Sequence, residues 1–145
     1  LPPNVRFYVE DIEQDWVESE GYDLIHYWPA PSQTGRLHRR LAGSIADWPA
    51  LVCQIYENLK PGGWVELQET INAIYSDDET LKPDNALVRL TDNLKKAHDM
   101  IGRTLDPAPK FTGWLETTGF CHITERKFKL PVGMWPKDRR LKEIG

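Results

Sequence analysis

The spacing of hydrophobic positions divides the chain into short extended runs and longer helical stretches. Residues 22–26 (YDLIH) form an apolar and aromatic run that is entered through Gly21, and such a run predicts a β-strand. From Asp47 the period changes to that of a helix, because Leu51, Val52, Ile55, Tyr56 and Leu59 fall on one helical face. With Asp47 as N-cap and Pro49 in the first turn, the pattern predicts a helix from Asp47 to Leu59.

A turn and a further strand follow this helix directly. Pro61-Gly62-Gly63 predicts a tight turn that needs glycine where φ is positive, and residues 63–69 (GWVELQE) predict the strand. The order strand, helix, strand favours a crossover in a parallel sheet. Residues 6–9 (RFYV) predict another strand near 5–10. The expected fold is therefore α/β in three layers, with three parallel strands and the 47–59 helix packed on the sheet.

The second half of the chain predicts two helices and one strand. Apolar spacing predicts a helix over residues 84–103, which the Asp106-Pro107 segment breaks. A short helix is expected over 111–118, ending at Gly119. Residues 121–130 alternate well enough to predict a fourth strand, and the tail over 131–145 is basic.

Composition restricts the class of partner. A length of 145 residues allows one domain, and the net charge of −4 disfavours nucleic acid and anionic membranes. No apolar run is long enough for a membrane span, and the first residues lack the pattern of a signal peptide, so an intracellular protein, cytoplasmic or nuclear, is expected. Charge is uneven: residues 1–26 carry seven acids and one base, and residues 126–145 carry seven bases and two acids. Two solvated surfaces of opposite sign explain this distribution.

Several kinds of site find no support in the sequence. Cys53 and Cys121 lie far apart and outside any CxxC motif, so we expect two small buried hydrophobes rather than a disulfide or zinc site. The four histidines show no close pairing, and no metal site is predicted. Glycine-rich phosphate-binding spacings and the GxSxG nucleophile motif are also absent. The six tryptophans are scattered, which favours core and interface packing over an aromatic cage.

Ligands of open parallel sheets bind beyond the carboxyl ends of the strands, and three segments lie at such ends: residues 10–12, His26-Tyr27 and Gln68-Glu69. The Asp11 carboxylate could accept hydrogen bonds from an adenine amino group or a ribose, or it could form a turn or helix cap. His26 could act as a general base near neutral pH, or it could be a structural histidine.

The motifs together resemble a known family. "PPNVRFYVEDIEQDW", "YDLIH", "RRLAGSIADWPALVCQIYENLKPGGWVELQE" and "TGFCHITERKFKLPVGMWPKDRRLKEIG" are similar to segments of class I S-adenosylmethionine-dependent methyltransferases. The resemblance is greatest to the fungal methyltransferases related to the LaeA-type regulators of secondary metabolism. It covers nearly the whole chain, and "LKPGGWVELQE" is its most specific piece.

The resemblance implies a Rossmann-like fold with S-adenosyl-L-methionine as cofactor. Residues 6–9 would correspond to the family's third strand, 22–26 to the fourth and 64–69 to the fifth. Asp11 would then meet the adenine, Ile12 would be its apolar neighbour, and His26 would lie near the methyl group. The cofactor-binding residues implied are Asp11, Ile12 and His26; His26 is the only candidate for catalysis, and the methyl acceptor is not identified.

The sequence departs from the family pattern in two ways. The glycine-rich turn after the first strand, the acid that ends the second strand, and the last strand of the family find no counterpart in these residues. Residues 28–38 (WPAPSQTGRLH) stand as an insertion at the mouth of the site, either a specificity loop or an artefact of the gene model. We therefore expect residues 1–145 to be a partial methyltransferase domain that lacks the first two strands and the last strand. Alone, it should fold poorly and not bind the cofactor with useful affinity.

Two other functions stay open at this point. The chain could be a non-catalytic interaction module derived from a methyltransferase fold, with the acidic and basic segments as contacts for a protein partner. It could also be another Rossmann-like binding domain that shares the strand–helix–strand order.

Overall fold

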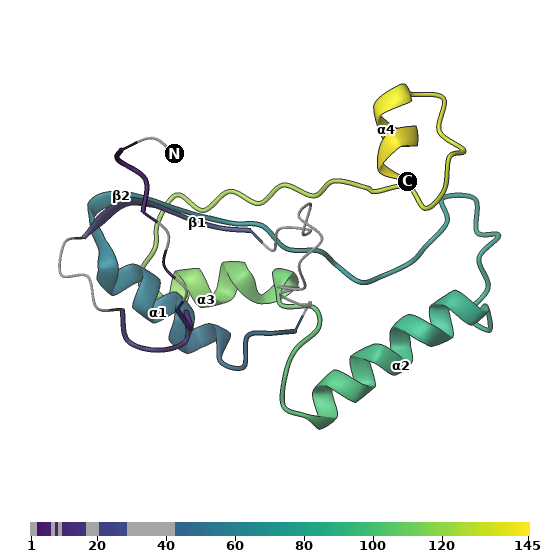
Figure 1. Cartoon of the computed structure of the whole chain (residues 1–145). Coiled ribbons are helices and arrows are strands. Elements are labelled where there is room, and N and C mark those ends of the chain that lie inside the picture. The colour runs from purple at the N-terminus through teal and green to yellow at the C-terminus, as the bar shows by residue number, and fades with distance from the viewer. Residues whose placement is uncertain (1–2, 7, 9, 17–20, 29–42) are drawn as a thin grey trace.

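The computed structural model describes residues 3–6, 8, 10–16, 21–28 and 43–145. In chain order the elements are strand β1 (Tyr22–Tyr27), helix α1 (Trp48–Asn58), strand β2 (Leu59–Leu67), helix α2 (Ala86–Met100), the 3-10 helix η1 (Ala108–Lys110), helix α3 (Phe111–Thr118) and helix α4 (Arg139–Ile144). Helices α1 and α3 lie on the same side of the sheet, and α2 lies apart from both (Figure 1). No helix in the described part of the chain is long and apolar enough to span a membrane.

The predicted strand–helix–strand unit is confirmed. β1 and β2 pair in parallel, with Leu24 opposite Trp64 and Tyr27 opposite Leu67. Within the described residues the sheet has these two strands. The fold is thus α/β with a small parallel sheet, compatible with part of a methyltransferase fold.

The predicted Pro61-Gly62-Gly63 turn is present as an irregularity inside β2. Tyr22 pairs with Leu59 and Leu24 with Trp64, so β2 places additional residues opposite β1 at this point. Gly62 has φ 82°, which a side chain would strain. A Cβ on Gly63 would lie 3.0 Å from the carbonyl oxygen of Tyr22, so glycine allows the two strands to approach here.

Helix α1 begins and packs as its sequence predicts. The Asp47 carboxylate accepts a hydrogen bond from the Ala50 N–H at 2.9 Å and caps the helix. Leu51, Val52 and Ile55 are at most 2% exposed. Burial of a side chain of this size contributes about 1.5–3 kcal/mol, so this face fixes the helix on the sheet. Tyr56, predicted on the same face, is 45% exposed.

The core lies between the sheet and the pair α1 and α3. Ile25, Tyr27, Val65 and Leu67 alternate along the two strands and pack toward this core. Phe111 and Leu115 bring α3 against it, and Gly119 ends α3 with φ 112°, as the sequence predicts. On the other face of the sheet, two apolar side chains are exposed, Leu24 at 58% and Trp64 at 67%.

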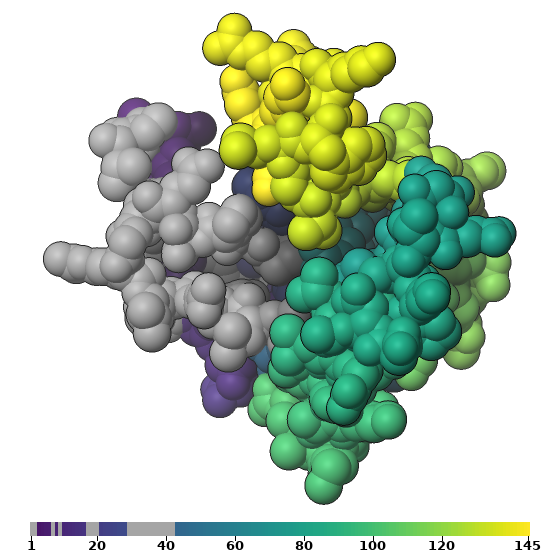
Figure 2. All heavy atoms as spheres, turned by 90° about the vertical axis from the view of Figure 1, so that its right-hand side faces the viewer, coloured from purple at the N-terminus to yellow at the C-terminus, as the bar shows by residue number. Residues whose placement is uncertain are grey.

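Helix α2 confirms the central part of the helix predicted over 84–103, with Asn85 as its N-cap. None of its residues is buried, and the apolar side chains of Leu87 and Leu94 are 48% and 46% exposed. In the view of Figure 2, α2 in teal and the C-terminal segment in yellow occupy separate parts of the surface. Periodicity therefore predicted the helix but not its burial.

Two predicted strands are not observed. Near residues 5–10, Phe7 and Val9 lie outside the described residues, and the described ones belong to no strand. Residues 121–130 run extended beside the sheet without entering it (Figure 1). A strand needs a neighbour that satisfies its N–H and C=O groups, and the described sheet supplies none to either segment. Two of the three expected parallel strands are thus confirmed, and the third, near residues 5–10, lies partly outside the described residues.

Two further expectations need correction or completion. Cys53 and Cys121 are exposed rather than buried, because Cys53 lies on the outer part of α1 and Cys121 follows the end of α3.

Helix α4 lies in the basic tail, for which the sequence pattern predicted no helix. Asp138 caps it by accepting from the N–H groups of Arg140 and Leu141, a signal that was readable in the sequence. Of the predicted insertion, residues 29–38 lie outside the described residues.

Candidate functional site

A cleft of about 240 Å³ opens beside the carboxyl end of β1. Its lining is mainly apolar and aromatic, and His26 also contributes to it: Ile12, Trp16, Ile25, His26, Tyr27, Trp28, Leu51 and Ile55. Ile12 and His26, two of the three residues predicted to bind a cofactor, therefore meet at one site. A site of this composition suits a flat heteroaromatic group with few polar contacts.

The segment of residues 11–16 forms one wall of the cleft, and side-chain hydrogen bonds hold it in place. The Trp16 indole N–H donates to the Ile12 carbonyl at 3.1 Å. The Glu13 carboxylate accepts from the backbone N–H groups of Ala46 and Asp47 at 2.8 and 2.9 Å. These donors precede α1, so Glu13 attaches the segment to the start of that helix.

Asp11 lies at the rim, outside the residues that line the cleft. Its carboxylate accepts a hydrogen bond from the Glu13 N–H at 3.1 Å, and its carbonyl accepts from the Gln14 N–H at 3.1 Å. This is the turn-forming role that its residue type also predicted. Because the side chain is exposed, the carboxylate keeps further lone pairs for a ligand, and its role in cofactor binding stays a prediction.

His26 stands on the exposed face of the sheet, opposite Glu66 in the strand register. Its Nδ1 lies 3.8 Å from the Glu66 Oε2, and the side chain is 42% exposed. The Gln68 amide donates to the Glu66 Oε1 at 2.7 Å, so the three side chains form a polar row. The imidazole has room for a ligand, and its part in binding or catalysis stays a prediction.

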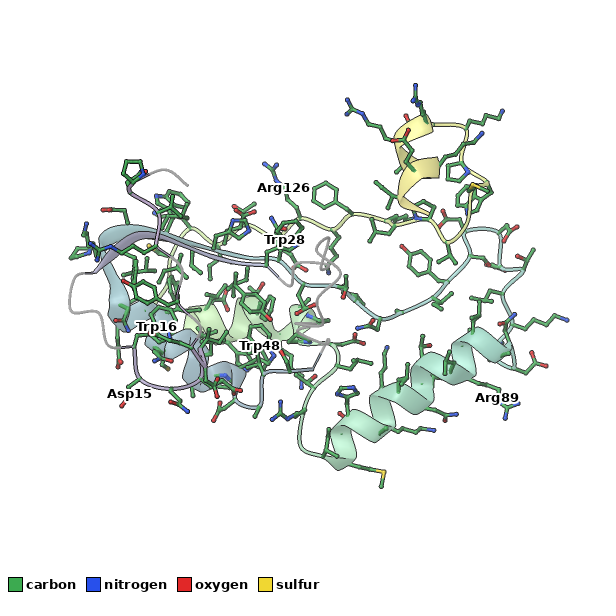
Figure 3. The ribbon with its side chains drawn as sticks, in the orientation of Figure 1. Asp15, Trp16, Trp28, Trp48, Arg89 and Arg126 are labelled. Atoms are coloured by element: carbon green, nitrogen blue, oxygen red, sulfur yellow. The ribbon has the colours of Figure 1, made fainter. Side chains whose placement is uncertain are left out.

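Aromatic rings surround the carboxyl end of β1. Trp28 follows the strand and is 56% exposed, and Trp48 lies at the start of α1 (Figure 3). The Tyr27 and Trp48 rings meet edge to face with centroids 5.2 Å apart, and Phe111 lies 4.9 Å from Trp48. The Tyr27, Trp48 and Phe111 rings thus form one packed aromatic group in the core. Core packing, predicted for the tryptophans as a group, holds for Trp48 but not for Trp28.

A second polar group occupies the carboxyl end of β2. Burial raises the pKa of the Glu69 carboxyl, against the hydrogen bonds that Thr70 donates to it. Burial also acts to raise the pKa of the nearby Asp106, but hydrogen bonds from Lys95 and Asn72 outweigh it and lower that pKa below its ordinary value. The surroundings therefore shift the pKa values of these two carboxyls in opposite directions.

Sequence reasoning selected Gln68-Glu69 as a strand end but missed the residues around it. Asn72 and Asp106 are 34 positions apart and joined by two hydrogen bonds, and Lys95 reaches Asp106 from α2. Glu13 was likewise missed as a link to the start of α1, 33 positions away. No local pattern marks such pairs, since each partner is an ordinary polar residue in its own segment.

The chain is similar to curated fungal proteins over nearly its whole length. It is 51% identical to methyltransferase pytC of Aspergillus terreus over 144 residues, which are 99% of this chain and 41% of that protein. It is 35% identical to a secondary metabolism regulator of Cochliobolus heterostrophus, of which it spans 45%. It is 31% identical to the protein-methionine methyltransferase laeA of Emericella nidulans, of which it spans 36%.

Two other comparisons found no match, since no family model and no solved structure matches the chain. The curated relatives match 99–100% of the chain in these three cases, whereas the chain spans less than half of each relative. As the motifs predicted, these 145 residues are homologous to part of the fungal methyltransferases that include the LaeA-type regulators of secondary metabolism.

Proposed function

We propose that the protein transfers a methyl group from S-adenosyl-L-methionine to an acceptor, and that these residues supply the adenine side of the cofactor site. The observation that carries the proposal is the cleft at the carboxyl end of β1, where Ile12 and His26 meet among aromatic rings. Homology to fungal methyltransferases supports the reaction class. The cofactor supplies an activated methyl group on a sulfonium, and the protein mainly has to position the two reactants.

In this proposal each predicted residue has a distinct role. Ile12 and the neighbouring rings hold the adenine between apolar surfaces. Asp11, at the rim, accepts a hydrogen bond from the adenine amino group with the lone pairs that Glu13 leaves open. His26 lies toward the methyl group. The acceptor is unidentified, and both a small molecule and a protein side chain are compatible with the open cleft.

The test is saturation-transfer NMR of S-adenosylmethionine with the 145-residue chain, a method that detects weak binding. We expect saturation of the adenine protons to exceed that of the methionine protons, since the proposed contacts lie on the adenine side. An Ile12→Asp variant should lose the adenine signal. A Val132→Asp variant, which changes an exposed residue far from the cleft in sequence, should keep it. Absence of saturation, or saturation mainly at the methionine end, would contradict the proposal.

The non-catalytic interaction module is the second candidate. Its basis is the exposed basic segment of residues 126–145, which carries exposed apolar side chains such as Phe128 and Trp135, 80% and 74% exposed. This second function would be favoured if the protein methylates no acceptor and binds an acidic protein partner. A protein partner and a nuclear or cytoplasmic location are proposals under either function.

A further inference from the structure

Glu13 completes the start of helix α1 from a segment that is distant in the sequence. Its Oε1 accepts hydrogen bonds from the backbone N–H groups of both Ala46 and Asp47, at 2.8 and 2.9 Å. In a capping box, a glutamate at the third helical position accepts from the N–H of the N-cap residue. The third residue of α1 is Ala50, which has no such acceptor, so Glu13 supplies it from 34 positions before the N-cap.

A second hydrogen bond joins the same segment to the middle of α1. The Gln54 side-chain amide donates to the Gln14 carbonyl at 2.6 Å. Residues 10–16 belong to no strand, and their Gln14 N–H donates to the Asp11 carbonyl within the segment itself. In the described part of the chain, the polar attachment of this segment to α1 therefore depends on two side chains, Glu13 and Gln54.

The attached segment and α1 form two facing parts of the cleft. The segment contributes Ile12 and Trp16 to the lining, and α1 contributes Leu51 and Ile55. Glu13 follows Ile12 directly, and the Trp16 indole N–H donates to the Ile12 carbonyl at 3.1 Å, so the two lining residues are linked to the Glu13 backbone. The shape of the cleft therefore depends on these hydrogen bonds as well as on the packing of Ile12 and Trp16 against the core.

We propose that Glu13 is a positioning residue of this cleft, and that it keeps the cleft in the shape that binds a flat heteroaromatic ring such as a purine. This inference rests on the proposed adenine site and deepens it. Glu13 acts through the hydrogen bonds that it accepts, since it is not among the residues that line the cleft. Because one oxygen accepts both bonds, a glutamine amide can replace the carboxylate, whereas a shorter aspartate cannot reach both N–H groups.

The first experiment measures hydrogen exchange of the Trp16 indole N–H by NMR, because a loosened segment exposes this proton to water. Glu13→Gln should keep its protection within about twofold, whereas Glu13→Asp and Glu13→Met should lower it by about fivefold or more. Glu57→Met, which changes an exposed glutamate of α1, is the matched control and should have no effect. The backbone amides of Ile55 and Val65 should stay protected in every variant.

Three outcomes of this experiment would overturn the proposal. Unchanged indole protection in Glu13→Met would mean that the segment does not depend on Glu13. Equal loss in Glu13→Gln and Glu13→Asp would mean that the charge matters rather than the hydrogen-bond geometry. Equal loss of protection at the indole and at the core amides would mean that Glu13 stabilises the whole fold rather than the cleft.

The second experiment measures binding of adenosine, which carries the purine ring without the methionine part of the cofactor. The unmodified chain, Glu13→Gln and Glu57→Met should bind it alike, and Glu13→Asp and Glu13→Met should bind it weaker by about fivefold or more. Gln54→Met keeps Glu13 but removes the second attachment, and it should also weaken binding. Unchanged affinity in the Glu13→Asp, Glu13→Met or Gln54→Met variant, or no adenosine binding to the unmodified chain at millimolar concentration, would overturn the inference.

The results for adenosine and for S-adenosylmethionine separate this inference from the proposed function. If adenosine behaves as expected and S-adenosylmethionine gives no saturation, the methyltransferase proposal fails and the role of Glu13 stands. If S-adenosylmethionine is saturated on its adenine side and the Glu13 variants bind adenosine like the unmodified chain, only the role of Glu13 fails.

Discussion

Helices α1 and α2 are both amphipathic and both begin at a capping side chain, but they have different places in the molecule. α1 lies between β1 and β2 in the chain order. It buries four residues: Trp48, Leu51, Val52 and Ile55. α2 buries none, and an ion pair of Lys95 with Asp106 joins it to the segment that follows. An apolar stripe thus gives a helix, whereas burial requires a surface that faces the stripe.

The two regions also divide the chemistry. The α1 region carries the apolar cleft with Ile12 and His26. The α2 region contributes Lys95, which pairs with Asp106 and helps to lower the pKa of that carboxyl. The proposed binding of a flat apolar group and the lowered pKa of Asp106 therefore depend on different parts of the chain, and substitutions can separate them.

The largest expected effect concerns the core. Leu51→Ala should cost about 2–5 kcal/mol, because it removes a fully buried side chain and leaves a cavity. Leu94→Ala on α2, where the side chain is 46% exposed, should cost less than about 1 kcal/mol. Amide hydrogen exchange measures both changes. Equal loss of protection in the two variants would mean that α2 is packed more tightly than described.

The next effect concerns the rim of the cleft. In a complete protein that contains these residues, Asp11→Ala should weaken cofactor binding by about 1–3 kcal/mol, the cost of removing one partner of a hydrogen bond. Calorimetry with S-adenosylmethionine measures it. Unchanged affinity would leave Asp11 only its turn-forming contact with Glu13.

Capping provides a matched comparison of the two helices. Asp47→Ala and Asn85→Ala each remove a side-chain acceptor of an N-terminal N–H and should cost about 1 kcal/mol. Loss of the Asp47 cap should lower protection throughout the core, whereas loss of the Asn85 cap should affect α2 alone. Hydrogen exchange resolved by residue distinguishes the outcomes, and spread of the Asn85 effect into β2 would contradict the separation.

The smallest effect is a dependence on pH. The pKa of Asp106 is lowered in the folded chain, so its contribution to stability is present above its ordinary value of 3.8 and is lost as the pH falls through the lowered pKa. The raised pKa of Glu69 has the opposite sign: it disfavours the folded state as the pH rises through 4.5 toward the raised pKa. We expect α2 to lose protection at a higher pH than α1 as acid is added. Amide hydrogen exchange measured for each helix tests this expectation. Simultaneous loosening would argue against a separate α2 attachment.

The sequence by itself determined the local elements where short-range chemistry is strong. Asp47 with the apolar positions that follow predicted α1, and Gly119 predicted the end of α3. The glycine turn near Gly62 and the parallel strands on either side of α1 were also predicted, because spacing, caps and φ preferences act within a few residues. The motif "LKPGGWVELQE" likewise carried the family relationship that the relatives confirm.

Tertiary structure alone decided which extended runs became strands and which polar residues met. Residues 121–130 have the alternation of a strand, but among the described residues no neighbouring strand supplies hydrogen bonds to them, so they lie outside the sheet. Glu13 contacts Ala46 and Asp106 contacts Asn72 across separations of 33 and 34 positions. Such contacts depend on the positions of whole elements in the fold, because the local sequence around a charged side chain does not specify which donor from another segment will contact it.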